Sequence, residues 1–149
     1  MRYQSSAGLL LYRRSAGETE VLLAHPGGPF WKAKDAGAWT IPKGQIETTE
    51  EPLEAARREF AEETGLSPAG PFLPLGNVRQ KAGKVVHAWA VESNADPAQL
   101  RSNLVTPADG RQPFPEIDRY AWFTVDEAKQ KLNPAQVELV DRLQAIVQR

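Results

Sequence analysis

Apolar residues along the chain fall into short runs that have the length of strands. Ala7–Tyr12 is a continuous apolar run, which favours a buried strand, and Glu20–Ala24 follows a turn as its expected hairpin partner. A Gly- and Pro-rich loop, Pro26–Gly37, comes next. Further strands are predicted at Ala38–Ile41, which Pro42 stops, and at Leu73–Lys81, Lys84–Glu92 and Tyr120–Thr124.

One segment between these strands has a helical pattern. Leu53, Ala56 and Phe60 recur at i, i+3 and i+7 and form an apolar stripe. Pro52 suits the first turn of a helix, and Gly65 suits its C-terminal stop. Caps and negative charge for the positive end of the helix dipole are expected from Thr48, Thr49, Glu50 and Glu51. The sequence therefore predicts a helix from about Pro52 to Gly65.

The C-terminal part contains a long connection and two helix starts. Ser93–Asp118 is polar and Pro-rich, and a loop of that length is usually functional or mobile. Thr124-Val-Asp-Glu127 has the capping-box pattern of a short helix. Asn133-Pro134 is predicted to open a last helix, whose core-facing residues are Val140, Leu143 and Val147. The order β-β-β-α-β-β-β-α predicts an α/β or α+β fold with a mixed sheet.

Composition narrows the class of protein. The 149 residues carry 18 Lys and Arg against 19 Asp and Glu, and this balance argues against a nucleic-acid coat or a polybasic membrane binder. The length predicts a single domain over residues 1–149. The absence of Cys excludes disulfides, thiol nucleophiles and Cys-bound zinc, and only His25 and His87 are present. The first apolar run is too short for a signal peptide or a membrane span, so a cytoplasmic location is expected.

Acidic residues gather in the predicted helix. At about 100° per residue, Glu59, Glu62 and Glu63 share one sector that flanks the apolar stripe, at the edge of the protein body. Like charges at this spacing destabilise a bare helix, so the arrangement makes sense if a hard divalent cation neutralises them. On periodicity alone, a solvated acidic face is the plain alternative.

The spacing around these acids favours the chemical interpretation. The segment Gly44-x5-Glu50-x7-Arg58-Glu59-Phe60-x-Glu62-Glu63-x-Gly65-Leu66 matches a complete Nudix signature. Seven identical positions have odds below about 10⁻⁷ per starting position by chance, because each residue type has a frequency below about one in ten. The chain therefore resembles a Nudix hydrolase of the MutT-like superfamily. His25–Gly44 is also similar to a bacterial subgroup of predicted nucleoside triphosphate pyrophosphohydrolases.

The resemblance implies a fold, a reaction and residue roles. The fold would be α/β, an α/β/α sandwich around a mixed sheet with the signature as a loop–helix–loop. Mg²⁺ or Mn²⁺ would bind mainly Glu59 and Glu63, with Glu62 close by and the Lys43 carbonyl contributing. The remaining signature residues would be structural: Arg58 and Glu50 would orient the glutamates, and Gly44 and Gly65 would permit tight loops.

The implied reaction is hydrolysis of a nucleoside diphosphate linked to another group. A nucleoside triphosphate, a dinucleoside polyphosphate or a nucleotide sugar would qualify. Positions 81–83 carry neither the proline nor the tyrosine typical of the ADP-ribose and diadenosine-polyphosphate subgroups. The partner is expected to be a small nucleotide, with no polymeric nucleic acid and no membrane. A Nudix-fold module that senses a nucleotide without cleaving it is the alternative, which a lost signature glutamate would favour.

The catalytic base is less determined. The predicted catalytic set is Arg58, Glu59, Glu62 and Glu116, and two of these acids are candidates for the base. Glu62 lies inside the signature, whereas Glu116 lies in the long connection, where two prolines restrict the chain. Asp118 and Asp109 compete with Glu116, and any of these loop acids could equally be solvated.

Substrate contacts are expected from two further regions. Arg79, Lys81 and Lys84 form a basic turn that would bind phosphates, or else a solvated hairpin tip. Trp31, beside Phe30, would stack on a base or simply pack in its loop. Trp39, Trp89 and Trp122 are expected in the core.

Overall fold

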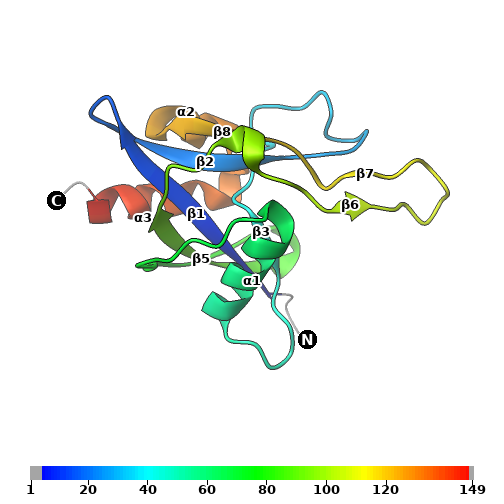
Figure 1. Ribbon diagram of the computed structural model, residues 1–149, viewed down its shortest axis with the longest axis horizontal. Coiled ribbons are helices and arrows are strands. Elements are labelled where there is room, and N and C mark those ends of the chain that lie inside the picture. Colours follow the sequence, from blue (N-terminus) through cyan, green and yellow to red (C-terminus); the bar gives the residue numbers. More distant parts are fainter. Residues whose placement is uncertain (1–4, 148–149) are drawn as a thin grey trace.

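The central strand of the sheet, β1 (Ser5–Ser15), contains the apolar run predicted from the sequence. In the computed structural model, which describes residues 5–147, β1 pairs with three strands. It is parallel to β5 (Val85–Glu92) and antiparallel to β2 (Glu18–Pro26) and β3 (Lys43–Gln45). With β4 (Leu73–Arg79) and β8 (Ile117–Thr124) the order is β4-β5-β1-β2-β8, and β3 lies off this path beside β1. The sheet is mixed, as predicted (Figure 1).

Helices cover both faces of this sheet. Successive residues of β1 point to opposite faces, so Leu10 packs on one side while Leu9 and Leu11 pack on the other. The first side is covered by α2 (Val125–Lys131) and α3 (Val137–Val147). The second is covered by α1 (Pro52–Thr64), whose buried apolar residues are Ala55, Ala56 and Phe60. The architecture is therefore the α/β/α sandwich that the resemblance implied.

Helix α1 has the predicted bounds, but its predicted cap is wrong. It starts at Pro52, and Gly65 closes it in the left-handed conformation with φ 81°. The N-cap residue is Glu51, and its side chain makes no capping hydrogen bond. Glu50 instead accepts a hydrogen bond from the backbone N–H of Glu47, so it closes the preceding loop.

The strand predicted at Ala38–Ile41 is also wrong. Only single bridges form there, Ala24 with Thr40 and Trp39 with Leu132, and the continuous pairing begins at β3. Pro42 has no backbone N–H to continue a ladder. The side chain of Gln136 accepts the hydrogen bond of the Ile41 N–H at 2.9 Å, in place of a neighbouring strand.

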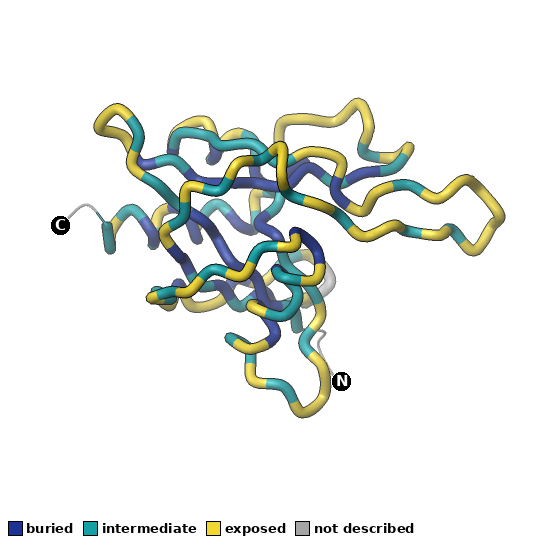
Figure 2. Tube along the Cα trace, viewed as in Figure 1, coloured by how far each residue is buried: buried dark blue, intermediate teal, exposed yellow. Residues whose placement is uncertain are grey.

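The Ser93–Asp118 connection contains structure that the sequence did not predict. A 3₁₀ turn, η2 (Pro97–Gln99), precedes a small antiparallel hairpin of β6 (Leu104–Val105) and β7 (Phe114–Pro115). Figures 1 and 2 show that this hairpin projects from the body and that its tip is exposed. Strands of two residues are too short to produce a periodic pattern.

The remaining elements follow the predictions closely. A 3₁₀ turn, η1 (Lys81–Gly83), joins β4 to β5, and the capping box of Thr124 and Glu127 opens α2. The last helix begins as a 3₁₀ turn, η3 (Pro134–Gln136), and continues as α3. Among the helices of residues 5–147, none has the length and apolar character needed to cross a membrane.

Candidate active site

The three signature glutamates of α1 differ in how deeply they are buried. The Glu63 residue is 3% exposed, whereas the Glu59 and Glu62 side chains are 20% and 55% exposed. The sequence placed all three at the edge of the body, which is wrong for Glu63. Glu63 follows Ala56 by seven residues, so two helical turns return it to the buried stripe. The acidic sector thus runs from the interior to solvent.

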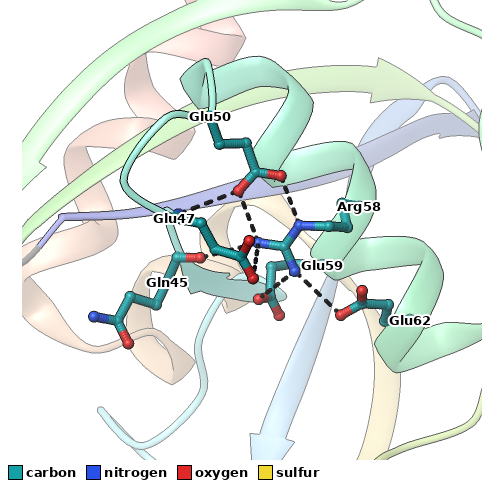
Figure 3. A network of polar contacts seen from close by, with 6 residues as sticks. All are labelled: Gln45, Glu47, Glu50, Arg58, Glu59 and Glu62. Atoms are coloured by element: carbon teal, nitrogen blue, oxygen red, sulfur yellow. Dashed lines mark hydrogen bonds and ion pairs between the residues drawn. The ribbon is translucent and has the colours of Figure 1, made fainter.

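One guanidinium organises the outer part of this sector. Arg58 binds both carboxylate oxygens of Glu50, at 2.6 and 2.8 Å, and donates to Glu59 at 3.0 Å and to Glu62 at 3.2 Å (Figure 3). These hydrogen bonds lower the pKa of Glu50. None of the described contacts of Arg58 reaches Glu63. Glu59 and Glu62 therefore share the positive charge of Arg58, whereas no described contact joins Arg58 to the buried Glu63.

The glycine that opens the signature allows a close approach. A Cβ atom on Gly44 would lie 2.1 Å from both Cδ and Oε2 of Glu59. The Glu59 carboxylate thus rests directly on the backbone of β3, and any larger residue at position 44 would displace it. Gly65 serves differently, because its positive φ is a conformation that side-chain-bearing residues avoid.

The long connection brings a fourth acid to this cluster. Burial, together with the negative charges of Glu116 and Glu59, raises the pKa of Glu63 to about 8, although Lys43 opposes the shift. Burial is also the main cause of the raised pKa of Glu59, to which Glu116 contributes. Burial and Lys84 lower the pKa of Lys43, while Glu63 and Glu116 oppose that shift. Glu116 therefore lies close enough to act on the signature acids and on Lys43.

A residue that sequence reasoning missed lies in the same place. Burial raises the pKa of Tyr120, and Glu63 and Glu116 add to the shift. Its hydroxyl donates to the backbone carbonyl of Arg101 at 2.8 Å. The sequence predicted a strand at Tyr120–Thr124, but no local signal indicated that Tyr120 lies beside the acids of α1.

The two acids that competed with Glu116 have other partners. Asp118 accepts a hydrogen bond from Nδ1 of the buried His25 at 2.8 Å, and Asp109 pairs with Arg111 at 2.7 Å in the turn between β6 and β7. The structure thus favours Glu116 among the three loop acids.

The basic turn after β4 lies at the end of the sheet where the signature begins. Val85, just past the turn, pairs with the first described residue of β1, and β3 pairs with the same part of β1. Gln136 donates to Gln80 at 3.1 Å and to Thr40 at 2.9 Å, which holds the turn beside the segment leading into β3. The three cations of the turn, Arg79, Lys81 and Lys84, are all exposed, and Lys84 also acts on Lys43. No contact described for Trp31 joins it to the α1 glutamates.

The donor chemistry of the cluster suits a hard divalent cation. Glu59, Glu63 and Glu116 offer only carboxylate oxygens, the ligands of Mg²⁺ and Mn²⁺. Within residues 5–147, no three acidic or His side chains already stand in a metal-holding arrangement. Binding of a metal ion would therefore require these side chains to turn. Glu63, buried among like charges, would gain most from a cation.

Comparison with known proteins agrees with this fold. A family model described as the NUDIX domain matches residues 2–143. The chain belongs to the Nudix family, and its class is that of the Nudix pyrophosphohydrolases.

Relatives of known name cover most of the chain. It is 40% identical over 143 residues to an RNA pyrophosphohydrolase of Bartonella henselae, covering 78% of this chain and 79% of the relative. It is 30% identical over 151 residues to that of Halorhodospira halophila, covering 84% and 80%. The crystal structure of a Caenorhabditis elegans Ap4A hydrolase binary complex matches the fold with a TM-score of 0.69 and 22% identity, covering 97% and 98%.

Proposed function

We propose that the protein is a hydrolase that depends on Mg²⁺ or Mn²⁺ and cleaves a phosphoanhydride bond of a nucleotide. The observation that carries this proposal is the position of Glu63. Its carboxyl group is 3% exposed, and the nearby charges of Glu116 and Glu59 disfavour its ionisation. A buried carboxylate in such surroundings costs stability unless a cation neutralises it. A metal-binding role explains why the helix holds the acid there.

The residues have distinct roles in this proposal. Glu59 and Glu63 hold the metal, with Glu62 beside them and the Lys43 carbonyl as a further ligand. A divalent ion bound there would screen the polyphosphate and lower the pKa of bound water. Arg58, fixed by Glu50, orients Glu59 and Glu62. Among basic residues of the turn, Lys84 is positioned best for phosphates, with Arg79 and Lys81 nearby.

Glu116 is the proposed base. It belongs to the cluster and lies outside the helix, so it can approach the water from another direction. Glu62 is the alternative, but its carboxylate already accepts a hydrogen bond from Arg58 at 3.2 Å.

The substrate is a nucleoside diphosphate linked to another group. The names of the relatives add RNA to the candidates, and the Ap4A hydrolase neighbour supports the dinucleoside polyphosphates that were already among them. The expectation that no polymeric nucleic acid is bound therefore stays a prediction.

A substrate panel with identified products tests the proposal. It comprises ATP, GTP, diadenosine tetraphosphate, a nucleotide sugar and a 5′-triphosphorylated RNA oligonucleotide, each with Mg²⁺, with Mn²⁺ and with EDTA. Chromatography should show phosphoanhydride cleavage of at least one substrate in the presence of metal and none in EDTA. Tight nucleotide binding without any product would instead indicate a sensing module.

A further inference from the structure

Three consecutive residues of the long connection bind the end of α1 to the start of β8. We call this segment, Arg101–Asn103, the brace. At one end of it, the Arg101 N–H donates to the carbonyl of Thr64, the last residue of α1, at 3.1 Å. At the other end, the Asn103 carbonyl accepts the N–H of Glu116 at 2.8 Å. The brace therefore joins the residue that follows the buried glutamate of α1 to the backbone of the proposed base.

The middle residue of the brace contributes its side chain. The Ser102 hydroxyl accepts a hydrogen bond from the Ile117 N–H at 2.8 Å and donates to the Asn103 carbonyl at 3.0 Å. A hydroxyl has one proton to donate, so the bond to Asn103 fixes its orientation. The same Asn103 carbonyl also accepts the Glu116 N–H. The Ser102 hydroxyl thus holds the Ile117 amide directly and the Glu116 amide through Asn103.

The sheet itself does not hold Glu116. The pairing of β2 with β8 shifts register between His25 and Pro26, and its last pair is Pro26 with Ile117. Beyond the sheet, the Glu116 carbonyl accepts the N–H of Gly27 at 2.8 Å, while the brace binds the Glu116 N–H. Both polar groups of this residue's backbone are therefore fixed by segments outside the regular ladder.

The first residue of the brace is fixed from two sides. The Tyr120 hydroxyl of β8 donates to the Arg101 carbonyl at 2.8 Å. The Arg101 side chain lies against the end of α1, since a Cβ atom on Gly65 would lie 3.1 Å from its Nε. The brace is thus attached to α1 and β8 before it reaches Glu116.

The position of this backbone decides where an exposed carboxylate can reach. The Glu116 residue is exposed, yet its charge contributes to the raised pKa of Glu63 and of Glu59. An exposed side chain keeps its rotamer freedom, so only its backbone anchors keep the carboxyl group near those acids. A misplacement of about 1 Å caused by a residue away from the chemistry can cost about 10²-fold in rate.

We propose that Ser102 is a positioning residue, which fixes Glu116 relative to the α1 glutamates through the brace. The inference rests on the proposed function for the role of Glu116 as the base. It adds that this part of the connection is a support for the base, and that Ser102 affects the reaction only through Glu116.

A double-mutant cycle tests this dependence. Ser102→Ala is made in wild type and in Glu116→Gln, and kinetics are measured with Mg²⁺ on the best substrate of the panel. In wild type, kcat should fall by about 10–100-fold with little change in KM. In Glu116→Gln, the further fall should be less than about 2-fold, because the group that Ser102 positions is already absent.

Two further variants control for the hydroxyl and for the connection. Ser102→Thr keeps a hydroxyl at the same place and should restore most of kcat. Thr106→Ala removes an exposed hydroxyl between β6 and β7 and should behave as wild type.

Amide hydrogen exchange, measured by NMR on metal-free protein, tests the brace without any turnover. In Ser102→Ala the Ile117 amide loses its acceptor, so it and the Glu116 amide should lose most of their protection. The amide of Leu10, in the centre of the sheet, should exchange at most about 2–13-fold faster, the factor that corresponds to one net hydrogen bond. A loss at Leu10 as large as that at Ile117 would show general destabilisation and would contradict the proposal.

The kinetic outcomes separate this proposal from the proposed function. Equal falls in kcat in both backgrounds, or an unchanged kcat in Ser102→Ala, would overturn the positioning role. If Glu116→Gln keeps wild-type kcat, there is no base for Ser102 to position, and the proposal is wrong. If wild-type protein cleaves no substrate of the panel, the proposed function fails, and hydrogen exchange alone decides whether Ser102 holds Glu116; unchanged protection of Ile117 would refute it.

Discussion

The two faces of the central sheet are covered by helices that bury different chemistry. The buried residues of α3 are all apolar: Leu139, Val140 and Leu143. Those of α1 include Ala55, Ala56 and Phe60 but also Glu63 and Thr64. Both helices use the same periodicity to attach to the sheet. The difference is that α1 gives one position of its buried stripe to a carboxylate. The α3 face therefore contributes stability, whereas the α1 face gives up some stability to hold charge in a defined place.

The arrangement around Glu63 shows how α1 tolerates this charge. Ala56 and Phe60 still anchor the helix, and Thr64 satisfies its hydroxyl by donating to the Phe60 carbonyl at 2.6 Å. Glu59, nearer the surface, receives a hydrogen bond from Arg58. Among the buried residues of α1, Glu63 is the one acid, and its pKa is raised well above the usual range of a glutamate.

Substitution of Glu63 should show most clearly that the α1 face serves activity and the α3 face serves stability. In Glu63→Gln we expect kcat to fall by roughly 10⁴-fold, because the loss of metal-based charge stabilisation is worth several kcal/mol. The metal-free variant should nevertheless melt at a higher temperature than metal-free wild type, since a buried like charge is gone. Glu54→Gln, an exposed site of the same helix, is the control and should change neither property. Wild-type turnover in Glu63→Gln would contradict the metal assignment.

Substitution of Glu116 tests whether the acidic cluster of α1 extends into the connection that precedes β8. Glu116→Gln should lower kcat by about 10²–10⁴-fold, the range of a general base, with little change in KM. Asp118→Asn is the matched control, since Asp118 is bound to His25 and should retain kcat. If Asp118→Asn loses kcat while Glu116→Gln keeps it, the wrong acid was chosen. If neither matters, Glu62 becomes the base.

The apolar face should respond in the opposite sense. Leu139→Ala removes a fully buried side chain under α3 and should lower the free energy of unfolding by about 2–5 kcal/mol. Because the buried residues of α3 include no acid, kcat per folded molecule should stay at the wild-type level. Urea titration and kinetics at low temperature measure the two quantities. A large fall in kcat per folded molecule would show that the faces are not independent.

A pH dependence of stability is also expected in the metal-free protein. The pKa of Glu63 is about 8 in the folded state against an ordinary value of 4.5, so the folded state binds more protons between these values. Stability is therefore highest below about pH 4.5 for this group and is lost as pH rises through about 8, with a slope of at most ~1.4 kcal/mol per pH unit. In Glu63→Gln the slope should flatten in urea titrations between pH 5 and 8. An equal slope in wild type and variant would refute the burial argument.

Much of the fold followed from local sequence signals. The stripe of Leu53, Ala56 and Phe60, with Pro52 and Gly65 at its ends, predicted α1 with its observed bounds. The capping box at Thr124 was confirmed for the same reason, because each such signal acts within a few residues. The strand predicted at Ala38–Ile41 failed because its outcome depends on Gln136, nearly a hundred positions away.

The acidic residues of the site can also be divided into those that local sequence spacing identified and those whose place depends on long-range contacts. Spacing alone selected Glu59, Glu62 and Glu63 and indicated the chemistry of carboxylates held together on one helix. The sequence also ranked Glu116 above Asp118, and the contact of Asp118 with His25 on another strand supports that choice, which stays a prediction. The place of Tyr120 beside Glu63 and Glu116 was likewise decided by packing. Helix periodicity is a property of neighbouring residues, whereas burial and charge at a site depend on segments that meet only when the chain has folded.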